Sequence, residues 1–259
     1  MRSILCPIDG AKTLDDRLET ALALARVTQG HVSVQIASPF AELAVWEPFG
    51  GAALTAEVID QVRQEDAALA ARVDARLAGQ DVPFDVVQTA RAPIPAAYAG
   101  SRFADVVVTS LADPLVEELA LGVRSPVLAV PQGKPLLDFA GPVMIAWDGG
   151  IESAHALRAA LPLLAQASAV HLVMVEEKAD ALPALDAAAY LSRHDIHAET
   201  HAIAPNGPIA ATLLETAGRL GAGLIVMGLF GRSRLRELLL GGVSRAMLDK
   251  SAVPLLLAH

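Results

Sequence analysis

Short apolar runs alternate along the whole chain with longer stretches rich in Ala and Leu. The apolar runs have the length of β-strands, and the longer stretches carry apolar residues at helical spacing. Each half of the chain therefore reads as β-α-β-α-β-α-β-α-β, an alternation that predicts right-handed crossovers and a parallel sheet. The expected strands are residues 3–9, 31–37, 84–89, 104–110 and 125–130 in the first half, and 143–148, 170–175, 197–203, 222–228 and 251–257 in the second.

The two halves repeat one another. An Asp-Gly pair closes the first strand of each half, Asp9-Gly10 and Asp148-Gly149, and an amphipathic helix follows it. We therefore expect an α/β fold of two tandem, open, five-stranded parallel-sheet domains, residues 1–131 and 142–259. Residues 132–141, rich in Pro and Gly, are expected to be the linker. The clearest helices are expected at residues 14–28, 94–102, 153–166, 208–220 and 243–250.

Composition narrows the class of protein. Hydrophobic residues make up 53% of the chain and aromatic residues only 4%, which suits parallel strands covered by helices rich in Ala and Leu. The formal net charge of −9 argues against nucleic acid or an anionic membrane as a partner. Cys6 is the single cysteine, so no intrachain disulfide forms, and it is expected to be a buried hydrophobe. No apolar run reaches the ~18 residues that span a bilayer. Asp9 comes too early for a signal peptide, so we expect a soluble, cytoplasmic protein.

The halves differ at two places. The first half carries an insertion, residues 39–54, whose apolar content favours a packing arm over a lid. The second half carries a glycine-rich segment, residues 227–245, that leads into its last helix. Glycines leave no Cβ between backbone and ligand, and the N–H groups at a helix start attract an anion. Four arginines accompany these glycines in an otherwise acidic chain: Arg232, Arg234, Arg236 and Arg245.

Asp148 closes the first strand of the same half, so we expect it to face the same crevice. In an open parallel sheet, ligands bind beyond the carboxyl ends of the strands, where the strand order reverses. Structural alternatives remain at this point. The glycines could form mere turns, Asp148 could cap the following helix, and Arg234 and Arg236 could belong to a solvated helix face.

The glycine spacing resembles that of the ATP-binding members of the universal stress protein family. Their pattern is Gly, two residues, Gly, nine residues, Gly, then Ser or Thr, and Gly228, Gly231 and Gly241 keep that spacing. Asp148 and the run Ile225–Gly228 also match. Because the repeat extends the likeness over nearly the whole chain, the sequence looks like a tandem member with two Rossmann-like domains of the adenine nucleotide α-hydrolase-like type.

The resemblance implies an ATP or AMP site in the second half, with Mg²⁺ as an accompanying ion. Asp148 and Ala146 would lie by the adenine and ribose, Val175 would pack on the adenine, and Met227 would line the ribose-phosphate side. The family's Ser or Thr is Gly242 here, and losing its hydroxyl contact would weaken binding by ~1.5–3 kcal/mol unless Ser244 or Arg232 compensates. The implied nucleotide-binding set is Ala146, Trp147, Asp148, Val175, Met227, Gly228, Gly231, Arg232, Gly241, Gly242, Val243 and Ser244.

The first half resembles the family's degenerate, non-binding domains, because it keeps Asp9 but lacks the glycine series. Single-domain relatives pair through their fifth strands, so the two halves are expected to form an intrachain pseudo-dimer. Whether two chains also associate as a homodimer is not written in the sequence.

The favoured function is a non-catalytic, adenine-nucleotide-binding protein with a regulatory role in stress response. No catalytic residue is predicted, although the sequence leaves slow ATP hydrolysis open. One alternative is a ligand-free interaction or dimerisation module. Another is an adenylating enzyme of the ATP pyrophosphatase type, because residues 148–153 loosely resemble the pyrophosphate loop of those enzymes. The nearby histidines His194, His197 and His201 are expected to be solvated rather than a zinc site, since a strand would put them on mixed faces.

Overall fold

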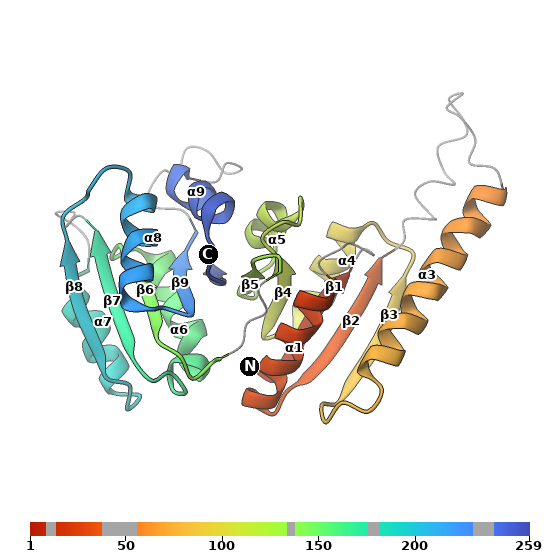
Figure 1. Ribbon diagram of the computed structural model, residues 1–259, viewed down its shortest axis with the longest axis horizontal. Coiled ribbons are helices and arrows are strands. Elements are labelled where there is room, and N and C mark those ends of the chain that lie inside the picture. The colour runs from red at the N-terminus through yellow and green to blue at the C-terminus, as the bar shows by residue number, and fades with distance from the viewer. Residues whose placement is uncertain (9–13, 38–55, 134–137, 176–181, 230–240) are drawn as a thin grey trace.

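The computed structural model describes residues 1–8, 14–37, 56–133, 138–175, 182–229 and 241–259. Both halves have the predicted alternation of strands and helices (Figure 1). The first half contains β1 (Ser3–Ile8), α1 (Leu14–Thr28), β2 (His31–Ala37), α3 (Ala56–Leu77), β3 (Phe84–Thr89), α4 (Pro93–Gly100), the 3₁₀ helix η2 (Ser101–Phe103), β4 (Val106–Ser110), α5 (Val116–Gly122) and β5 (Val127–Val130). The second half contains β6 (Val143–Ala146), α6 (Ile151–Leu164), β7 (Val170–Val175), α7 (Ala184–Ser192), β8 (Ala198–Ile203), α8 (Ile209–Leu220), β9 (Leu224–Gly228), α9 (Gly242–Lys250) and β10 (Leu255–Ala258).

The strands form one sheet in the order β3-β2-β1-β4-β5-β10-β9-β6-β7-β8. All pairs within each half are parallel. The strand order reverses between β1 and β4 in the first half, and between β6 and β9 in the second. The predicted α/β fold of two open, five-stranded parallel sheets is therefore confirmed. The reversal points are where such sheets bind ligands.

The two parallel sheets join through their fifth strands. β5 and β10 pair antiparallel, with Leu256 opposite Leu128, so the sheet runs without a break from one half to the other (Figure 1). Both strands are buried along their whole length. An ion pair adds a polar contact between the halves, since Nη2 of Arg245 on α9 lies 3.2 Å from Oε2 of Glu117 on α5. Apolar burial dominates this junction, because an exposed ion pair contributes little.

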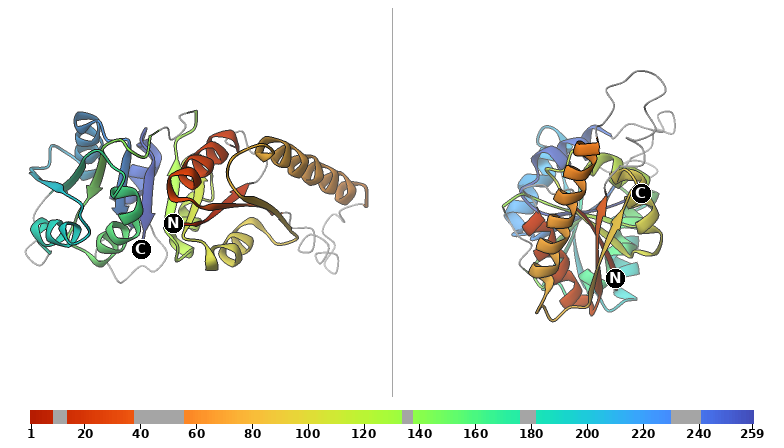
Figure 2. Two further views of the ribbon diagram at one scale, coloured as in Figure 1. Left: turned by 90° about the horizontal axis from the view of Figure 1, so that it is seen from below. Right: turned by 90° about the vertical axis from the view of Figure 1, so that its right-hand side faces the viewer.

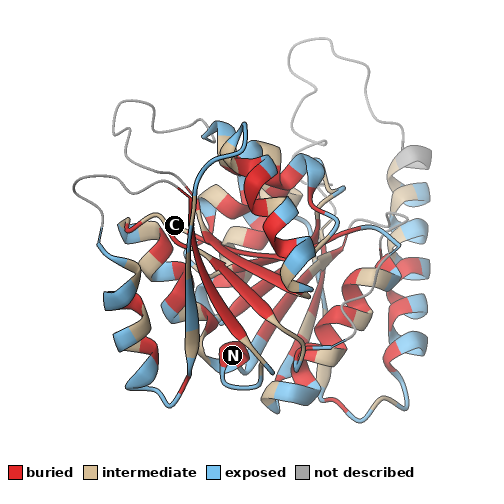
Figure 3. Ribbon diagram, turned by 60° about the vertical axis from the view of Figure 1, so that its left-hand side comes forward, coloured by how far each residue is buried: buried red, intermediate tan, exposed pale blue. Residues whose placement is uncertain are grey.

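Each face of the sheet carries its own apolar layer (Figure 2). Helices α1, α3, α6 and α7 pack on one face, over strand residues such as Ile4 and Ile145. Helices α4, α5, α8 and α9 pack on the other face, over Val107 and Val173 among others. Figure 3 shows the buried strands between helices whose outer surfaces are exposed. Because the central strands are covered on both sides, they read in the sequence as continuous apolar runs.

Smaller expectations concern Cys6, the linker, the insertion and membrane-spanning helices. Cys6 is fully buried, as expected, and this burial raises the pKa of its thiol to about 11 despite the nearby positive charge of Arg17. Phe139, which the sequence places in the linker, packs into the apolar core beside α6. The insertion at residues 39–54 lies outside the described residues. Among the helices that are described, none combines the length and the apolar character that crossing a membrane requires.

Candidate functional site

The strand-order reversal of the second half brings the ends of β6 and β9 together. These strands are neighbours, and Ala146 near the end of β6 pairs with Met227 near the end of β9. Val175 ends β7 on the other side of β6. The side chains of Ala146, Val175 and Met227 all belong to the apolar layer on the α8 and α9 face. The structure therefore brings three residues of the predicted nucleotide site onto one face, at the carboxyl edge of the sheet.

The side chain of Trp147 lies on the opposite face of the sheet from these three residues. Its side chain belongs to the apolar layer on the opposite face, beside α6, and is only 5% exposed. Its indole nitrogen donates a hydrogen bond of 2.9 Å to the carbonyl oxygen of Leu182. The backbone of Trp147 remains at the end of β6, where its N–H donates to the carbonyl of Val173. The sheet thus separates the Trp147 side chain from those of Ala146, Val175 and Met227.

Asp148 shapes the turn between β6 and α6. Its Oδ1 accepts a 2.9 Å hydrogen bond from the backbone N–H of Gly150, and Gly149 between them has φ of +71°. Gly150 itself is the residue that precedes α6, without a side-chain cap. Asp148 therefore holds the turn that leads into the helix, and its carboxyl group stays half-buried at the carboxyl edge. This local role is compatible with a further contact to a ligand.

Gly228 is required by the packing of β9 against α6. A Cβ at this position would lie 2.4 Å from the backbone nitrogen of Ser153 and 2.5 Å from the backbone carbon of Glu152. Neither backbone atom can move without shifting the first turn of α6. The Ser153 hydroxyl already donates to the carbonyl of Gly150, at 2.9 Å. The first glycine of the series thus allows a close approach of two elements, independently of any ligand.

Gly241 and Gly242 differ from Gly228 in their surroundings. Gly241 caps α9 with φ of −61° and ψ of 150°, and Gly242 is the first helical residue. Both are exposed, and a Cβ on either would meet nothing within 4 Å. Of the two residues that follow, Val243 is half-buried against the α9-side layer and Ser244 is only 6% exposed. The start of α9 therefore presents open backbone at Gly241 and Gly242, whereas Ser244 is buried.

Several residues of the predicted site cannot be placed. Gly231 and Arg232 lie outside the described residues, as do Arg234 and Arg236. The remaining arginine of that cluster, Arg245, pairs with Glu117 of the first half. The described part of the site thus consists of the apolar floor, the Asp148 turn and the start of α9.

The first half has an ion pair at the equivalent place. Nη1 of Arg17 on α1 lies 3.5 Å from Oδ2 of Asp113 after β4, and the two side chains are only 1% and 7% exposed. The same Nη1 donates a 3.0 Å hydrogen bond to the carbonyl of Pro7 on β1. Asp113 also accepts hydrogen bonds from the Thr109 hydroxyl and the Leu115 backbone. The cavity that remains there has a volume of about 20 Å³, which is room for a water molecule but not for a nucleotide.

Sequence reasoning missed this pair, although a signal for it was present. Arg17 follows Leu14 by three residues and precedes Ala21 by four, so it lies on the buried face of α1. A charged residue is unusual on such a face. Counting from the repeated aspartates Asp9 and Asp148, Arg17 corresponds to Ala156. Counting from the ends of β4 and β9, Asp113 corresponds to Gly231. The first half therefore has side chains where the second half has a methyl group and a glycine.

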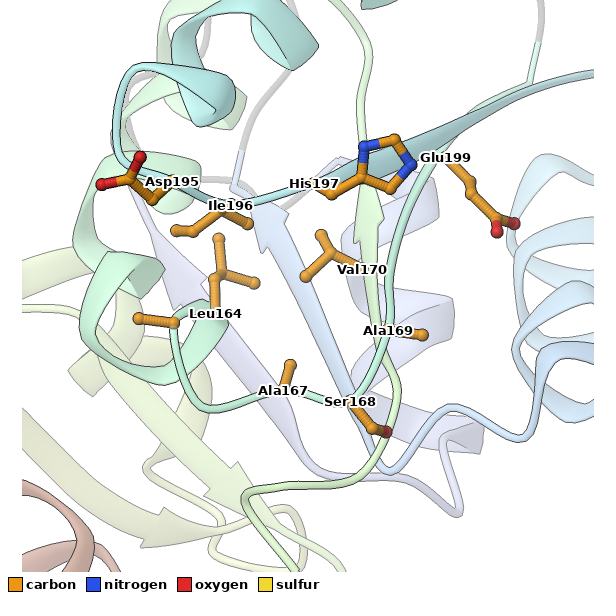
Figure 4. Close-up of a pocket in the computed structure, with 10 residues that line it drawn as sticks. Leu164, Ala167, Ser168, Ala169, Val170, Asp195, Ile196, His197 and Glu199 are labelled. Atoms are coloured by element: carbon orange, nitrogen blue, oxygen red, sulfur yellow. The ribbon is translucent and has the colours of Figure 1, made fainter.

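A larger cavity, of about 230 Å³, lies at the opposite edge of the second half (Figure 4). It is bounded by the end of α6, the start of β7 and the segment before β8, with Leu164, Val170, Ile196 and Glu199 among its lining residues. These are the amino-terminal ends of the strands. This cavity is therefore separate from the crevice that the glycine pattern predicts.

Comparisons with known proteins agree with this geometry. The family model described as "Universal stress protein family" matches residues 140–259. No curated protein sequence matches the chain. The solved structure of a universal stress protein from Archaeoglobus fulgidus DSM 4304 superimposes with a TM-score of 0.79 at 16% identity, covering 98% of this chain and 97% of that one. A protein of Pseudomonas aeruginosa UCBPP-PA14, described as a universal stress protein, gives a TM-score of 0.64 at 18% identity and covers 100% of this chain and 93% of that one.

The two structural matches extend over both halves, and at these identities they show a shared fold. The family model adds a sequence match to the half that carries the glycine series. Residues 140–259 therefore match the universal stress protein family in sequence, and the chain as a whole shares its fold with the Archaeoglobus universal stress protein.

Proposed function

We propose that the second half, residues 142–259, binds one adenine nucleotide, ATP or AMP, at the carboxyl edge of β6 and β9. The observation that carries this proposal is the strand-order reversal between β6 and β9, where Ala146, Val175 and Met227 form an apolar floor at the carboxyl edge of the sheet. An apolar floor suits an adenine ring, and the open backbone at the start of α9 suits phosphate. The Mg²⁺ that accompanies ATP would take phosphate oxygens and water as ligands.

Two features of the site define the binding contacts. Asp148 contributes a carboxylate from the turn after β6, and Gly241 and Gly242 contribute backbone N–H groups. Met227, Gly228, Gly231 and Arg232 complete the phosphate side in this proposal, with Val243 and Ser244 supporting the start of α9. Because Trp147 has its indole on the other face, its part in the site is limited to its backbone.

The first half acts as a structural partner rather than as a second site. The buried Arg17–Asp113 pair and the small remaining cavity support this part of the proposal. The antiparallel pairing of β5 with β10 supports an intrachain pseudo-dimer. A regulatory role in the cytoplasmic stress response rests on the family resemblance.

An adenylating activity of the ATP pyrophosphatase type is the weaker candidate. Such an enzyme would need residues 148–153 to hold pyrophosphate. Ser153 is only 2% exposed and its hydroxyl donates to the carbonyl of Gly150, so it is already engaged within the protein. A ligand-free interaction module is the stronger alternative, since Gly242 lacks the family's hydroxyl, and the binding experiment decides between it and the proposal.

Equilibrium dialysis of the chain against labelled ATP and AMP tests the proposal with two opposed variants. Gly241→Val has room for its side chain, which would cover the start of α9, so the fold is kept and the nucleotide binds more weakly. Gly242→Ser restores the missing hydroxyl and tightens binding by about tenfold to a hundredfold, the equivalent of ~1.5–3 kcal/mol.

Gly218→Val is the matched control, because Gly218 is exposed on α8 with nothing within 4 Å of its would-be Cβ. It should leave nucleotide affinity unchanged. Absence of binding near millimolar concentration in both the natural chain and Gly242→Ser contradicts the proposal and leaves the interaction module.

A further inference from the structure

Three potential metal ligands converge on neighbouring strands of the second half. His171 lies on β7 and is paired in register with Glu199 on β8, and Val173 is paired with His201. Side chains two apart along a strand point to the same face, so Glu199 and His201 share the face of His171. The ring nitrogens and the carboxylate oxygen of this cluster all lie within 4.8 Å of one another.

The spacing of the three atoms fits a small divalent ion. His171 Nδ1 lies 3.2 Å from His201 Nε2 and 3.5 Å from Glu199 Oε2, and the third side of the triangle, from His201 Nε2 to Glu199 Oε2, is 3.8 Å. A point equidistant from these three atoms is about 2.0 Å from each, which matches zinc–imidazole and zinc–carboxylate bonds. The separations of the three ligand atoms therefore suit such an ion.

Burial within the cluster is graded from the protein interior to solvent. The side chain of His171 is 11% exposed, that of His201 is 30% exposed and that of Glu199 is 63% exposed. Helix α8 packs against β7 on this face. Glu199 is the most exposed of the three ligands, so the coordination position that the protein leaves free would face solvent on its side. Glu199 borders the cavity at the start of β7 and β8, but Figure 4 shows its carboxylate pointing away from the other lining residues, so an ion would reach the cluster from solvent rather than through the cavity.

We propose that His171, Glu199 and His201 bind one divalent transition-metal ion of the zinc class, with water as the fourth ligand. Two imidazole nitrogens and one carboxylate are ligands that Zn²⁺ accepts, whereas Mg²⁺ and Ca²⁺ prefer oxygen alone. The site is distinct from the proposed nucleotide crevice. His171 and Val175 lie on the same strand four residues apart, about 13 Å at the rise of a parallel strand.

Such an ion would fasten an edge of the sheet. β8 is the last strand of the second half, and its residues are largely half-buried or exposed. An edge strand pairs with one neighbour only. A metal ion bound by side chains of both β7 and β8 would add a cross-link to the backbone pairing of these two strands. Because the ion binds only when the two strands are paired, a higher concentration of free metal would stabilise the folded β7–β8 edge.

The sequence alone pointed to a different set of histidines. His194 and His197 are exposed, in agreement with the expectation that they are solvated, and His194 stacks against Tyr190 instead. His201 finds its partner on β7, which is 30 residues away in the chain. Only the strand register reveals that pair.

Calorimetric titration of Zn²⁺ into the full chain, dialysed first against a chelator, tests the proposal. We expect one tight site per chain, and Co²⁺ in its place should give the visible absorption of a tetrahedral ion. Glu199→Gln should weaken Zn²⁺ binding by about tenfold to a hundredfold, and His201→Gln by about a hundredfold or more. At a hundredfold excess of free Zn²⁺ over its dissociation constant, the midpoint of thermal unfolding should rise by about 5–10 °C.

His197→Gln is the control, because it removes an exposed histidine just before β8 that is not a member of the cluster. It should bind Zn²⁺ as the natural chain does. Glu199 and His201 are accessible enough for their variants to fold, which melting of the metal-free proteins verifies. The proposal is overturned if the natural chain binds no Zn²⁺ at micromolar concentration, or if Glu199→Gln and His201→Gln bind as well as His197→Gln. In that case the two histidines are only a hydrogen-bonded pair.

Discussion

Glycine allows close packing at Gly228, the last residue of β9, and leaves the backbone open at Gly241 and Gly242. Replacing Gly228 with Ala tests the packing role. The new Cβ would lie 2.4 Å and 2.5 Å from backbone atoms of Ser153 and Glu152, whereas ordinary contact begins at 3.4 Å. The end of β9 or the first turn of α6 must therefore move by about 1 Å, and overpacking of this kind costs about 3 kcal/mol. For a chain of this size we expect the midpoint of thermal unfolding to fall by about 6–12 °C.

Urea unfolding followed by far-ultraviolet circular dichroism measures this loss directly. Gly218→Ala is the matched control, because its Cβ meets nothing within 4 Å on the exposed side of α8. That variant should be as stable as the natural chain or more stable by up to about 1 kcal/mol. If Gly228→Ala loses less than about 0.5 kcal/mol, the close approach of β9 to α6 is not what demands glycine at this position, and our reasoning on it fails.

Two further predictions concern the first half. Arg17→Met leaves the buried Asp113 carboxylate without its cation, so the free energy of unfolding should fall by about 3–5 kcal/mol. The double variant with Asp113→Asn should recover part of this loss. If the losses of the two single variants simply add in the double variant, the pairing is contradicted. Burial raises the pKa of Cys6 from 9.0 to about 11, so unfolding releases a proton in that range and stability should fall as the pH rises through it. Cys6→Ala should lack this contribution, and identical pH profiles for the two proteins would refute it.

The fold could be predicted from the sequence because its local signals agree. β2, β3 and β7 have the bounds that the apolar runs indicate, and α1 does as well. The repeated Asp-Gly turns indicated two domains. The pairing of β5 with β10 could not be predicted in this way, because no local sequence pattern specifies which strands meet across a domain boundary. The resemblance suggested that pairing, and the register of Leu256 with Leu128 describes it.

The candidate site was only partly within reach of sequence reasoning. Strand ends and turn glycines follow from the pattern, so the positions of Ala146, Val175 and Met227 at one edge could be anticipated. The direction of a side chain after a strand ends is less determined, and Trp147 packs on the opposite face to the rest. The Arg17–Asp113 pair and the His171–His201 pair each join residues far apart in the chain, so their detection needs the sheet register and the helix packing.

The number of adenine nucleotides bound per chain tests the central claim most directly. Mass spectrometry of the unmodified, purified chain under non-denaturing conditions, with and without added ATP, counts them without any variant. Because the first half has a buried ion pair where the second half has Ala156 and Gly231, we predict one nucleotide per chain at saturation. Two nucleotides per chain, or none at millimolar ATP, would contradict the account.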